Sequence, residues 1–383
     1  MNRRVRRILL VFLNTGGGHR STAHAVAETL TDLYADRVQV DLVDVTTHYF
    51  SWPLSELDAI YQWMVRLHGW PWALAYHLTD GPRRLALLRG ASWLLTGRSI
   101  LALLEDHPAD VVVCCHPLLK APCGQALALR RPGTPLITLV TDLASAHATW
   151  FVGDHECCLV ATEPARERAR ACGLPDESIH VVGLPVRPCF IEAARRDPIA
   201  VRHQLGLDPD GPVVLLMGGA DGVGSLLHLA KAISDSDVQA QLAVITGRNQ
   251  RLRRELESCA RSFPLRIQGF VHNLEDWMRA ADLVVTKAGP STVSEALVIG
   301  LPMVLSGALP GQERPNADYV VEGGAGVWAP TPAEAARAVY ELLSTGSAAL
   351  TAMTECARAL ARPDAARRAA QVIWEAAGGQ LAW

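Results

Sequence analysis

The sequence contains no long apolar run, little excess charge and few lysines. No stretch approaches the roughly 18–20 apolar residues of a membrane-spanning helix, which argues against an integral membrane protein. The formal net charge is −3 over 383 residues, so the chain lacks the basic excess typical of a dedicated nucleic-acid-binding protein. Only three of the 36 cationic residues are lysines, and Phe and Tyr, with six each, are outnumbered by ten Trp.

Cysteine spacing typical of metal sites is absent as well. The nine cysteines include the adjacent pairs Cys114–Cys115 and Cys157–Cys158, which do not match the CxxC spacing of zinc ligands. Most cysteines lie in or beside apolar runs, which predicts buried free thiols in a reducing cytoplasm. Two Asp pairs of the DxD form, at 208–210 and 235–237, fall in predicted surface connections. No metal is therefore expected.

The first residues contain four arginines, at positions 3, 4, 6 and 7, followed by the apolar run Ile8–Leu13. This run is shorter than the roughly 7–15 residues of a signal-peptide core, and it ends in a glycine-rich loop. We therefore expect a first buried strand and no export. The arginines could contact anionic lipid or form a solvated basic segment.

The sequence is rich in short β-favouring runs that alternate with longer amphipathic stretches. Helical periodicity fills most of the gaps between these runs. Such alternation is typical of parallel sheets covered by helices on both faces. Strands are predicted at residues 7–13, 38–44, 111–115, 136–140, 157–160, 179–182, 213–217, 242–246, 265–268, 283–286, 303–306 and 326–328.

The length suggests two domains, at roughly 100–200 residues per domain. The strand pattern restarts near residue 210, and GLPVRP at 183–188 looks like a linker. We predict two Rossmann-like domains, residues 1–185 and 186–383, with the final helix a candidate to pack back on the first. Ligands of such sheets bind outside the carboxyl ends of the strands, so the active site is expected in a cleft between the halves.

One segment, at about residues 46–105, departs from the alternation because it has helical periodicity but no convincing strand. It is also unusually rich in tryptophan. A helix with Trp on its apolar side and flanking Arg can lie in a membrane interface, but a Trp stripe at helical spacing is also common in a protein core. Both readings stay open. The tryptophans are Trp52, Trp63, Trp70, Trp72 and Trp93.

The segment NTGGGHRSTAHAV, at residues 14–26, joins the first predicted strand to a helix. Glycine allows the backbone to approach a ligand closely, and a helix N-terminus favours negative charge. The segment matches neither the dinucleotide fingerprint nor the P-loop. Gly17 and Gly18 are therefore candidate anion-binding residues. His19 is a candidate general base near neutral pH, with helix capping as the alternative.

A second candidate loop, TDLASAHATWF at 141–151, follows the strand predicted at 136–140. Asp142, His147 and Trp150 could face the same cleft. Asp142 could orient an imidazole or an acceptor hydroxyl, or it could cap a turn. His116 ends another strand, where a satisfied histidine at the edge of the core is the plainer reading.

Two turns in the second half favour phosphate. MGGADGVG at 217–224 and TKAGPSTVSEAL at 286–297 each follow a strand and lead into a helix, which makes an anion-binding turn. Glu295 lies one helical turn further on and could accept hydrogen bonds from a ribose. Two such turns in one half indicate a nucleotide diphosphate donor.

Several motifs occur together in a specific order: GGGHRSTAHA, TDLASAHATWF, GLPVRP, LLMGGADGVG, ITGRN, GFVHNLEDWMRAADLVVTKAGPSTVSEAL and GLPMVLSGALPGQE. Over about residues 7–345 the chain resembles the monogalactosyldiacylglycerol synthase group and the bacterial diacylglycerol glycosyltransferases of glycosyltransferase family 28. The resemblance implies a GT-B fold of two facing Rossmann-like domains. It further implies inverting, metal-independent transfer of a hexose from a UDP-sugar to the sn-3 hydroxyl of 1,2-diacylglycerol.

The resemblance also assigns roles to residues. His19 matches the proposed catalytic base, and His147 and Trp150 match the acceptor motif, although Ala148 stands where proline is usual. Phe270 and Val271 would hold uracil, Glu295 the ribose and Gln312 with Glu313 the sugar. The positions that match those around the nucleotide sugar are Gly219, Arg248, Val271, Gly289, Pro290, Ser291, Glu295, Gln312 and Glu313.

These implications complete the prediction. No cofactor is expected, and the partners are a UDP-sugar, diacylglycerol and a membrane surface that contains anionic lipid, reached from the cytoplasmic side of the cell membrane. Galactose is the first choice of sugar and glucose the second, whereas glucuronic acid would need a nearby cation. The alternatives are a UDP-sugar 2-epimerase, a UDP-N-acetylglucosamine transferase acting on another membrane lipid, and a non-catalytic lipid- or nucleotide-binding protein.

Overall fold

The computed structural model of the chain describes residues 4–15, 17–66, 69–152, 157–219, 226–259, 265–344 and 347–380. The chain divides into two compact units. Unit 1 comprises residues 1–188, 310–312 and 363–383, and unit 2 comprises residues 189–309 and 313–362. The chain therefore changes unit after Pro188, three residues beyond the predicted boundary, and it returns to unit 1 at its C-terminal end.

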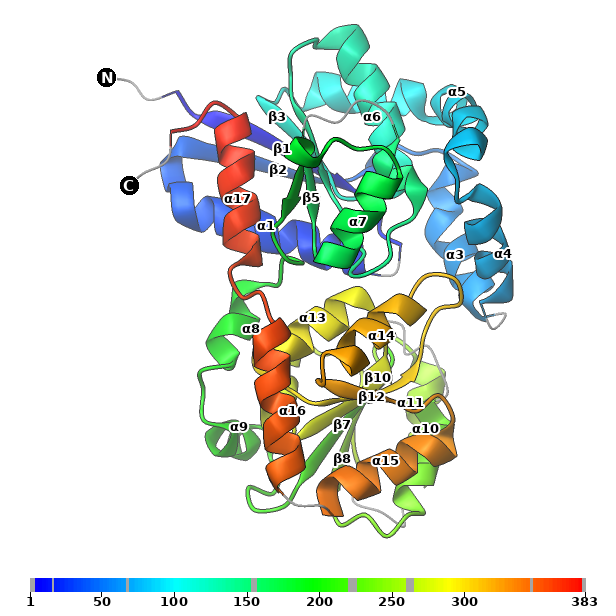
Figure 1. The fold of residues 1–383 in the computed structure, drawn as a ribbon, viewed down its shortest axis with the longest axis vertical. Helices are drawn as coiled ribbons and strands as arrows, with labels where there is room; N and C mark the ends of the chain where they lie inside the picture. The colour runs from blue at the N-terminus through cyan, green and yellow to red at the C-terminus, as the bar shows by residue number, and fades with distance from the viewer. Residues whose placement is uncertain are drawn as a thin grey trace. The chain divides into compact units, whose positions relative to one another are not determined.

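Unit 1 is built on a six-stranded parallel sheet in the order β2-β1-β3-β4-β5-β6 (Figure 1). Its strands are β1 (Arg6–Phe12), β2 (Val38–Asp44), β3 (Val111–Cys114), β4 (Leu136–Leu139), β5 (Cys157–Val160) and β6 (Ile179–Val181). Its helices are α1 (Gly18–Tyr34), α2 (Val45–His48), α3 (Leu57–Arg66), α4 (Trp70–Thr79), α5 (Pro82–Asp106), α6 (Pro117–Arg130), α7 (Glu163–Ala171) and α17 (Ala365–Ala376), with 3-10 turns at Ala35–Arg37, Leu54–Glu56, Ala148–Phe151 and Asp176–Ser178.

Unit 2 is built on a second six-stranded parallel sheet in the order β12-β11-β10-β7-β8-β9. Its strands are β7 (Val213–Met217), β8 (Gln241–Ile245), β9 (Leu265–Gln268), β10 (Leu283–Lys287), β11 (Met303–Gly307) and β12 (Gly326–Trp328). Its helices are α8 (Pro188–Ala193), α9 (Pro198–Leu205), α10 (Leu226–Ser234), α11 (Gln250–Cys259), α12 (Leu274–Ala280), α13 (Pro290–Ile299), α14 (Arg314–Glu322), α15 (Pro332–Ser344) and α16 (Ser347–Leu360).

Every predicted strand is present, with its ends shifted by at most one residue. The prediction succeeds because parallel strands buried on both faces are nearly continuous apolar runs. In β3, β4 and β7, for example, every residue is buried. The predicted fold class, two α/β units with parallel sheets, is confirmed.

The final helix, α17, belongs to unit 1 and packs against α1. The Trp374 and Tyr34 rings stack with their centroids 4.1 Å apart, and Ile373 is fully buried in the same core. Figure 1 shows α17 in red beside the dark blue α1. The last helix therefore completes the cover on one face of the unit 1 sheet.

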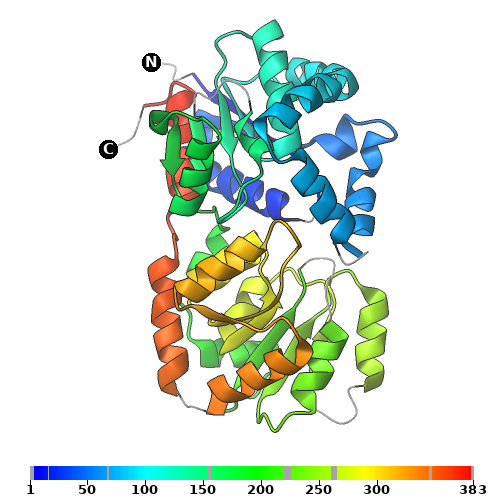
Figure 2. The ribbon, with the colours of Figure 1, turned by 45° about the vertical axis from the view of Figure 1, so that its right-hand side comes forward.

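The segment predicted to be helical but strandless contains α2 to α5. Figure 2 shows α3 and α4 projecting beside the unit 1 sheet, and the two helices contact each other. The second half of α5 anchors the segment, because Ile100, Leu103 and Leu104 are buried against β1 and β3. The first half of the segment also contributes Phe50 to this core, but it leaves Trp52, Trp63 and Trp70 largely exposed.

Candidate functional site

Three loops meet at the carboxyl edge of the unit 1 sheet. They follow β1, β3 and β4, which are neighbours in the sheet. The strand order reverses between β1 and β3, and such a switch point is the usual ligand site of an open parallel sheet. These loops bring together His19, Cys115, His116 and Thr141, although up to 122 positions separate them in sequence.

His19 lies in the first turn of α1, just after Gly17, which adopts the left-handed conformation with φ of 79°. Its Nδ1 lies 3.0 Å from the carbonyl oxygen of Cys115 and 2.6 Å from Oγ1 of Thr141. A carbonyl oxygen only accepts hydrogen bonds, so Nδ1 must carry the proton. Nε2 is therefore the unprotonated nitrogen, as a general base requires.

Burial keeps the His19 imidazole neutral. Desolvation lowers its pKa from 6.5 to about 4, and the hydrogen bond to the Cys115 carbonyl offsets only part of this effect. The His116 ring lies edge-on at 4.4 Å between centroids, and burial lowers its pKa well below the ordinary value too. His116 accepts a hydrogen bond from the Leu118 N–H through Nδ1 and therefore donates through Nε2 to Thr15 Oγ1 at 3.0 Å.

The lowered pKa of His19 predicts an unusual pH profile. If His19 acts as a base, kcat/KM should stay level from about pH 8 to about pH 5 and reach half its maximum near pH 4, because a pKa of about 4 keeps the imidazole neutral in that range. An acid limb centred at 6.5 would contradict this. Protonation of a group with a lowered pKa also destabilises the fold as pH falls, so circular dichroism at each pH must show folded protein.

The predicted acceptor-side residue Asp142 is bonded to two other predicted residues. Its Oδ2 accepts a hydrogen bond from Trp150 Nε1 at 2.7 Å, and its Oδ1 accepts one from Gln312 Nε2 at 2.8 Å. Trp150 is 0% exposed and packs in a core cluster beside β5, with its ring centroid 6.1 Å from that of His19. Trp150 is therefore a buried core residue that lies beside His19 and donates a hydrogen bond to Asp142.

His147 joins the loop after β4 to helix α4. Its Nε2 donates to the Tyr76 carbonyl oxygen at 3.1 Å, and Thr79 Oγ1 lies 3.2 Å away. Its Nδ1 accepts from the Thr149 N–H at 3.1 Å. Burial lowers the pKa of His147. Both ring nitrogens are thus engaged, and His147 fixes α4 to the loop that follows β4.

A second candidate site lies at the switch point of the unit 2 sheet, between β7 and β10. Gly219, just after β7, has φ of 76°, a conformation that favours glycine. A Cβ at Gly289, just after β10, would lie 3.0 Å from Lys287 Nζ. The two predicted glycines therefore flank the Lys287 side chain, and residues 220–224 of the motif lie outside the described residues.

The N-terminus of α13 is suited to an anion. Gly289 precedes the helix, Pro290 is its first residue and Ser291 its second, so the first peptide N–H groups have no partner within the helix. The buried Ser291 Oγ also has no hydrogen-bond partner among the described residues. Buried polar atoms without partners are rare, and a phosphate oxygen would satisfy both. Glu295, 7% exposed, follows in the same helix.

Phe270 and Val271, predicted to hold uracil, follow β9, and Arg248, predicted to lie near the nucleotide sugar, follows β8. The Arg248 guanidinium carbon lies 5.6 Å from the centroid of the Phe270 ring. Phe270 is about half exposed and Val271 is half-buried. The two loops thus form one exposed edge of unit 2, on which an aromatic face and a cation lie together.

Gln312 and Glu313 are neighbours in sequence, yet they bond differently. Glu313 is buried, and its Oε1 accepts from Lys287 Nζ at 2.5 Å while its Oε2 accepts from the Leu309 N–H at 2.8 Å. Glu313 therefore holds Lys287 in place. Gln312 belongs to unit 1 and bonds to Asp142.

Three contributors to these sites were not predicted: Thr141, the Cys115 carbonyl and Lys287. A backbone carbonyl leaves no mark on the sequence, and a threonine after a strand is common. Lys287 did carry a signal, since it ends a buried strand and precedes the phosphate-favouring turn. A charged residue at that position could have been chosen from the motif alone.

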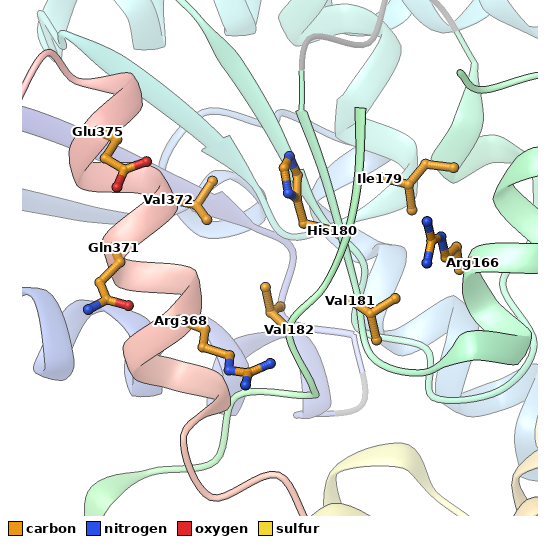
Figure 3. A pocket seen from close by; sticks show the side chains of 9 residues that line it. All are labelled: Arg166, Ile179, His180, Val181, Val182, Arg368, Gln371, Val372 and Glu375. Carbon is orange, nitrogen blue, oxygen red and sulfur yellow. The ribbon is translucent and has the colours of Figure 1, made fainter. Parts of the chain in front are cut away.

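A cavity of about 470 Å³ lies away from all the predicted residues, between β6 and α17. Figure 3 shows side chains of α17, among them Arg368 and Glu375, on one side of it and those of His180 and Val182 on the other. Arg166 on its rim is already paired with Asp176 at 2.9 Å. The predicted sites consequently belong to the strand ends and not to this cavity.

Family profiles match both units. Residues 19–186 match the profile described as monogalactosyldiacylglycerol (MGDG) synthase, and residues 213–368 match that of the glycosyltransferase family 28 C-terminal domain. A relative from Oryza sativa subsp. japonica, probable monogalactosyldiacylglycerol synthase 2, chloroplastic, is 37% identical over 94% of this chain and 78% of its own. Monogalactosyldiacylglycerol synthase 1, chloroplastic, from Arabidopsis thaliana is 33% identical over 94% of this chain and 69% of its own.

Solved structures share the fold at low sequence identity. MurG from Acinetobacter baumannii has a TM-score of 0.59 at 18% identity, over 97% of this chain and 99% of its own. Anabaena HepE in complex with UDP-glucose has a TM-score of 0.59 at 16% identity, over 97% of this chain and 98% of its own. These likenesses confirm the GT-B fold class.

Proposed function

Because the chain belongs to the monogalactosyldiacylglycerol synthase family, we propose that it transfers galactose from UDP-galactose to the sn-3 hydroxyl of 1,2-diacylglycerol. The product is a β-galactosyl diacylglycerol, formed with inversion at the anomeric carbon and without a metal ion. The observation that carries this proposal is His19, a neutral imidazole with an unprotonated Nε2 at a strand switch point. The relatives' names favour galactose over glucose.

His19 acts as the general base in this reaction. The acceptor hydroxyl gives its proton to Nε2 while its oxygen forms the bond to C1 of the sugar. The bond between C1 and the β-phosphate oxygen breaks, and UDP leaves with the electron pair. His19 then returns its proton to water, which its low pKa favours.

The departing diphosphate needs positive charge where no metal is used. The N-terminus of α13 offers unpaired peptide N–H groups and the Ser291 hydroxyl. Lys287 adds an ammonium group beside Gly289. Fixed donors of this kind stabilise charge as it develops in the transition state. Unit 2 therefore offers its own donors for the charge of the leaving group.

The test of the proposal compares UDP-galactose incubated with and without diacylglycerol vesicles. A galactosyltransferase consumes the nucleotide sugar in step with the appearance of a galactolipid, and only when diacylglycerol is present. A UDP-sugar 2-epimerase would instead alter the nucleotide sugar without lipid. A protein that only binds lipid or nucleotide would leave both substrates intact.

Membrane contact would come from the apolar face of the segment α2 to α5. Trp52, Trp63 and Trp70 are 81%, 60% and 62% exposed, and Leu74 and Leu78 continue the Trp70 side of α4 at spacings of four residues. Such spacing places side chains on one helix face. The other tryptophans pack inward: Trp72 lies edge-on to Tyr61 at 5.1 Å, and Trp93 packs against a core cluster. Among the described residues, no helix is long and apolar enough to cross a membrane.

Replacing the exposed tryptophans should weaken vesicle binding. Because Trp52, Trp63 and Trp70 keep most of their surface in solvent, their change to serine removes apolar area without opening the core. We expect partitioning onto vesicles of mixed zwitterionic and anionic lipid to fall at least about tenfold, measured by flotation. The matched control changes two other exposed apolar residues, Leu129 and Ile199, to serine. Equal flotation of both variants would remove this face from the membrane role.

A further inference from the structure

Asp142 is a buried carboxylate placed between a core residue and a loop residue. It is 5% exposed, and its two oxygens accept from Trp150 Nε1 at 2.7 Å and from Gln312 Nε2 at 2.8 Å. The Trp150 indole is itself fully buried, so one side of the carboxylate is fixed by the core. Asp142 thus connects the packed core of unit 1 to Gln312, which lies 170 positions later in the sequence.

The hydrogen bond to Asp142 sets which way the Gln312 amide points. An ionised carboxylate only accepts hydrogen bonds, whereas the two ends of an amide differ, because its nitrogen donates and its oxygen accepts. The nitrogen must therefore face Asp142, and Oε1 must face away. Gln312 is half-buried, and within the described part of the chain Oε1 has no hydrogen-bond partner.

The backbone around Gln312 is held as firmly as its side chain. Ser145 Oγ donates to the Gln312 carbonyl oxygen at 2.6 Å. The preceding Gly311 has φ of 83°, and a Cβ there would lie 3.6 Å from the Ala73 backbone and 3.4 Å from His77 Nε2 of α4. The loop is therefore pinned to two parts of unit 1, and the Gln312 backbone has little freedom to move relative to Asp142.

We propose that Asp142 is a positioning residue for sugar recognition: it fixes the Gln312 amide so that Oε1 presents a hydrogen-bond acceptor to one hydroxyl of the donor sugar. This rests on the proposed function and on the family resemblance, which implies that Gln312 contacts the sugar. A fixed acceptor is satisfied only by a hydroxyl that points at it. Because galactose and glucose differ in the orientation of one hydroxyl, such a contact can distinguish them.

The test replaces a hydrogen-bond acceptor of Asp142 by a donor without changing the shape of the side chain. In Asp142→Asn, the new amide oxygen can still accept from Trp150, and its nitrogen then faces Gln312. Gln312 must turn its oxygen inward and its nitrogen outward, which inverts the contact offered to the sugar. We expect kcat/KM for UDP-galactose to fall about tenfold, as for the loss of one hydrogen bond, while the Kd of UDP alone stays unchanged.

Gln312→Glu alone sets two carboxylates against each other and should also lower kcat/KM. The double variant Asp142→Asn with Gln312→Glu restores the pattern. Its asparagine amide donates to one oxygen of the new glutamate, and the other glutamate oxygen faces outward as an acceptor. Recovery of at least half of the lost kcat/KM is expected. A purely structural role would instead change the melting temperature and the Kd of UDP together with kcat/KM.

Two results would overturn the inference. One is a double variant no better than either single variant, although all three melt within a few degrees of the parent protein. The other is an equal loss for UDP and for UDP-galactose in Asp142→Asn. If the parent protein transfers no galactose to diacylglycerol, the proposed function fails instead, and this outcome is recognised before any variant is made.

Discussion

Replacing His19 by alanine is expected to lower kcat for galactose transfer about 10²–10⁴-fold, the usual contribution of a general base. The reason is geometric as well as chemical. The Cys115 carbonyl fixes the proton on Nδ1 and leaves Nε2 as the base. His116, whose ring lies beside that of His19, cannot replace it, because it accepts through Nδ1 and donates through Nε2.

The control for this variant is His24→Ala, one and a half turns further along α1 and half-buried. It removes a histidine from the same helix without touching the cluster around His19, so kcat should hardly change. The Kd of UDP, measured by calorimetry, should be the same in both variants, since the nucleotide is proposed to bind in unit 2. Near-normal turnover by His19→Ala would remove His19 from the base role.

Replacing Glu295 by alanine is expected to weaken UDP binding about 10- to 100-fold, the range for hydrogen bonds to a charged group. Glu295 is buried in the second turn of α13, the helix whose N-terminus is proposed to hold the diphosphate. A ribose beside that diphosphate would place its hydroxyls near this carboxylate. The measurement is the Kd of UDP by calorimetry, with thermal melting to show that the variant is folded.

A matched ligand isolates the ribose contact. UDP that lacks both ribose hydroxyls should bind the parent protein more weakly than UDP does. It should then lose almost nothing further when Glu295 is replaced. If the variant weakens UDP and its dideoxy analogue equally, Glu295 acts on the packing of α13 and not on the ribose.

The sequence was sufficient to predict the sheets and the loops that carry the sites. Buried parallel strands appear in the sequence as apolar runs, and the carboxyl ends of such strands lie at the same edge of the sheet. Positions such as His19, Gly219 and Ser291 could therefore be chosen before any coordinates. The sequence could not predict which tryptophans are exposed. Trp63 and Trp72 occur in similar apolar stretches of sequence, and only tertiary packing leaves Trp63 exposed and Trp72 half-buried.

Sequence reasoning also could not predict the hydrogen-bond partners of the site residues. Asp142 was expected to orient an imidazole or an acceptor hydroxyl, and its hydrogen bonds to Trp150 and Gln312 were not foreseen. The imidazole is oriented instead by a backbone carbonyl and by Thr141. Contacts between loops far apart in sequence depend on how neighbouring strands are ordered, and the order of strands is not contained in any single motif.

The most direct test of the account is mass spectrometry and proton NMR of the lipid formed from diacylglycerol vesicles and UDP-galactose. The expected product is a diacylglycerol that carries one hexose at the sn-3 position, with the large anomeric coupling of a β-galactoside, and UDP-glucose should give a smaller yield. An α-linked product would contradict inversion. Consumption of UDP-galactose without any glycolipid would contradict the central claim that this chain is a galactosyltransferase acting on diacylglycerol.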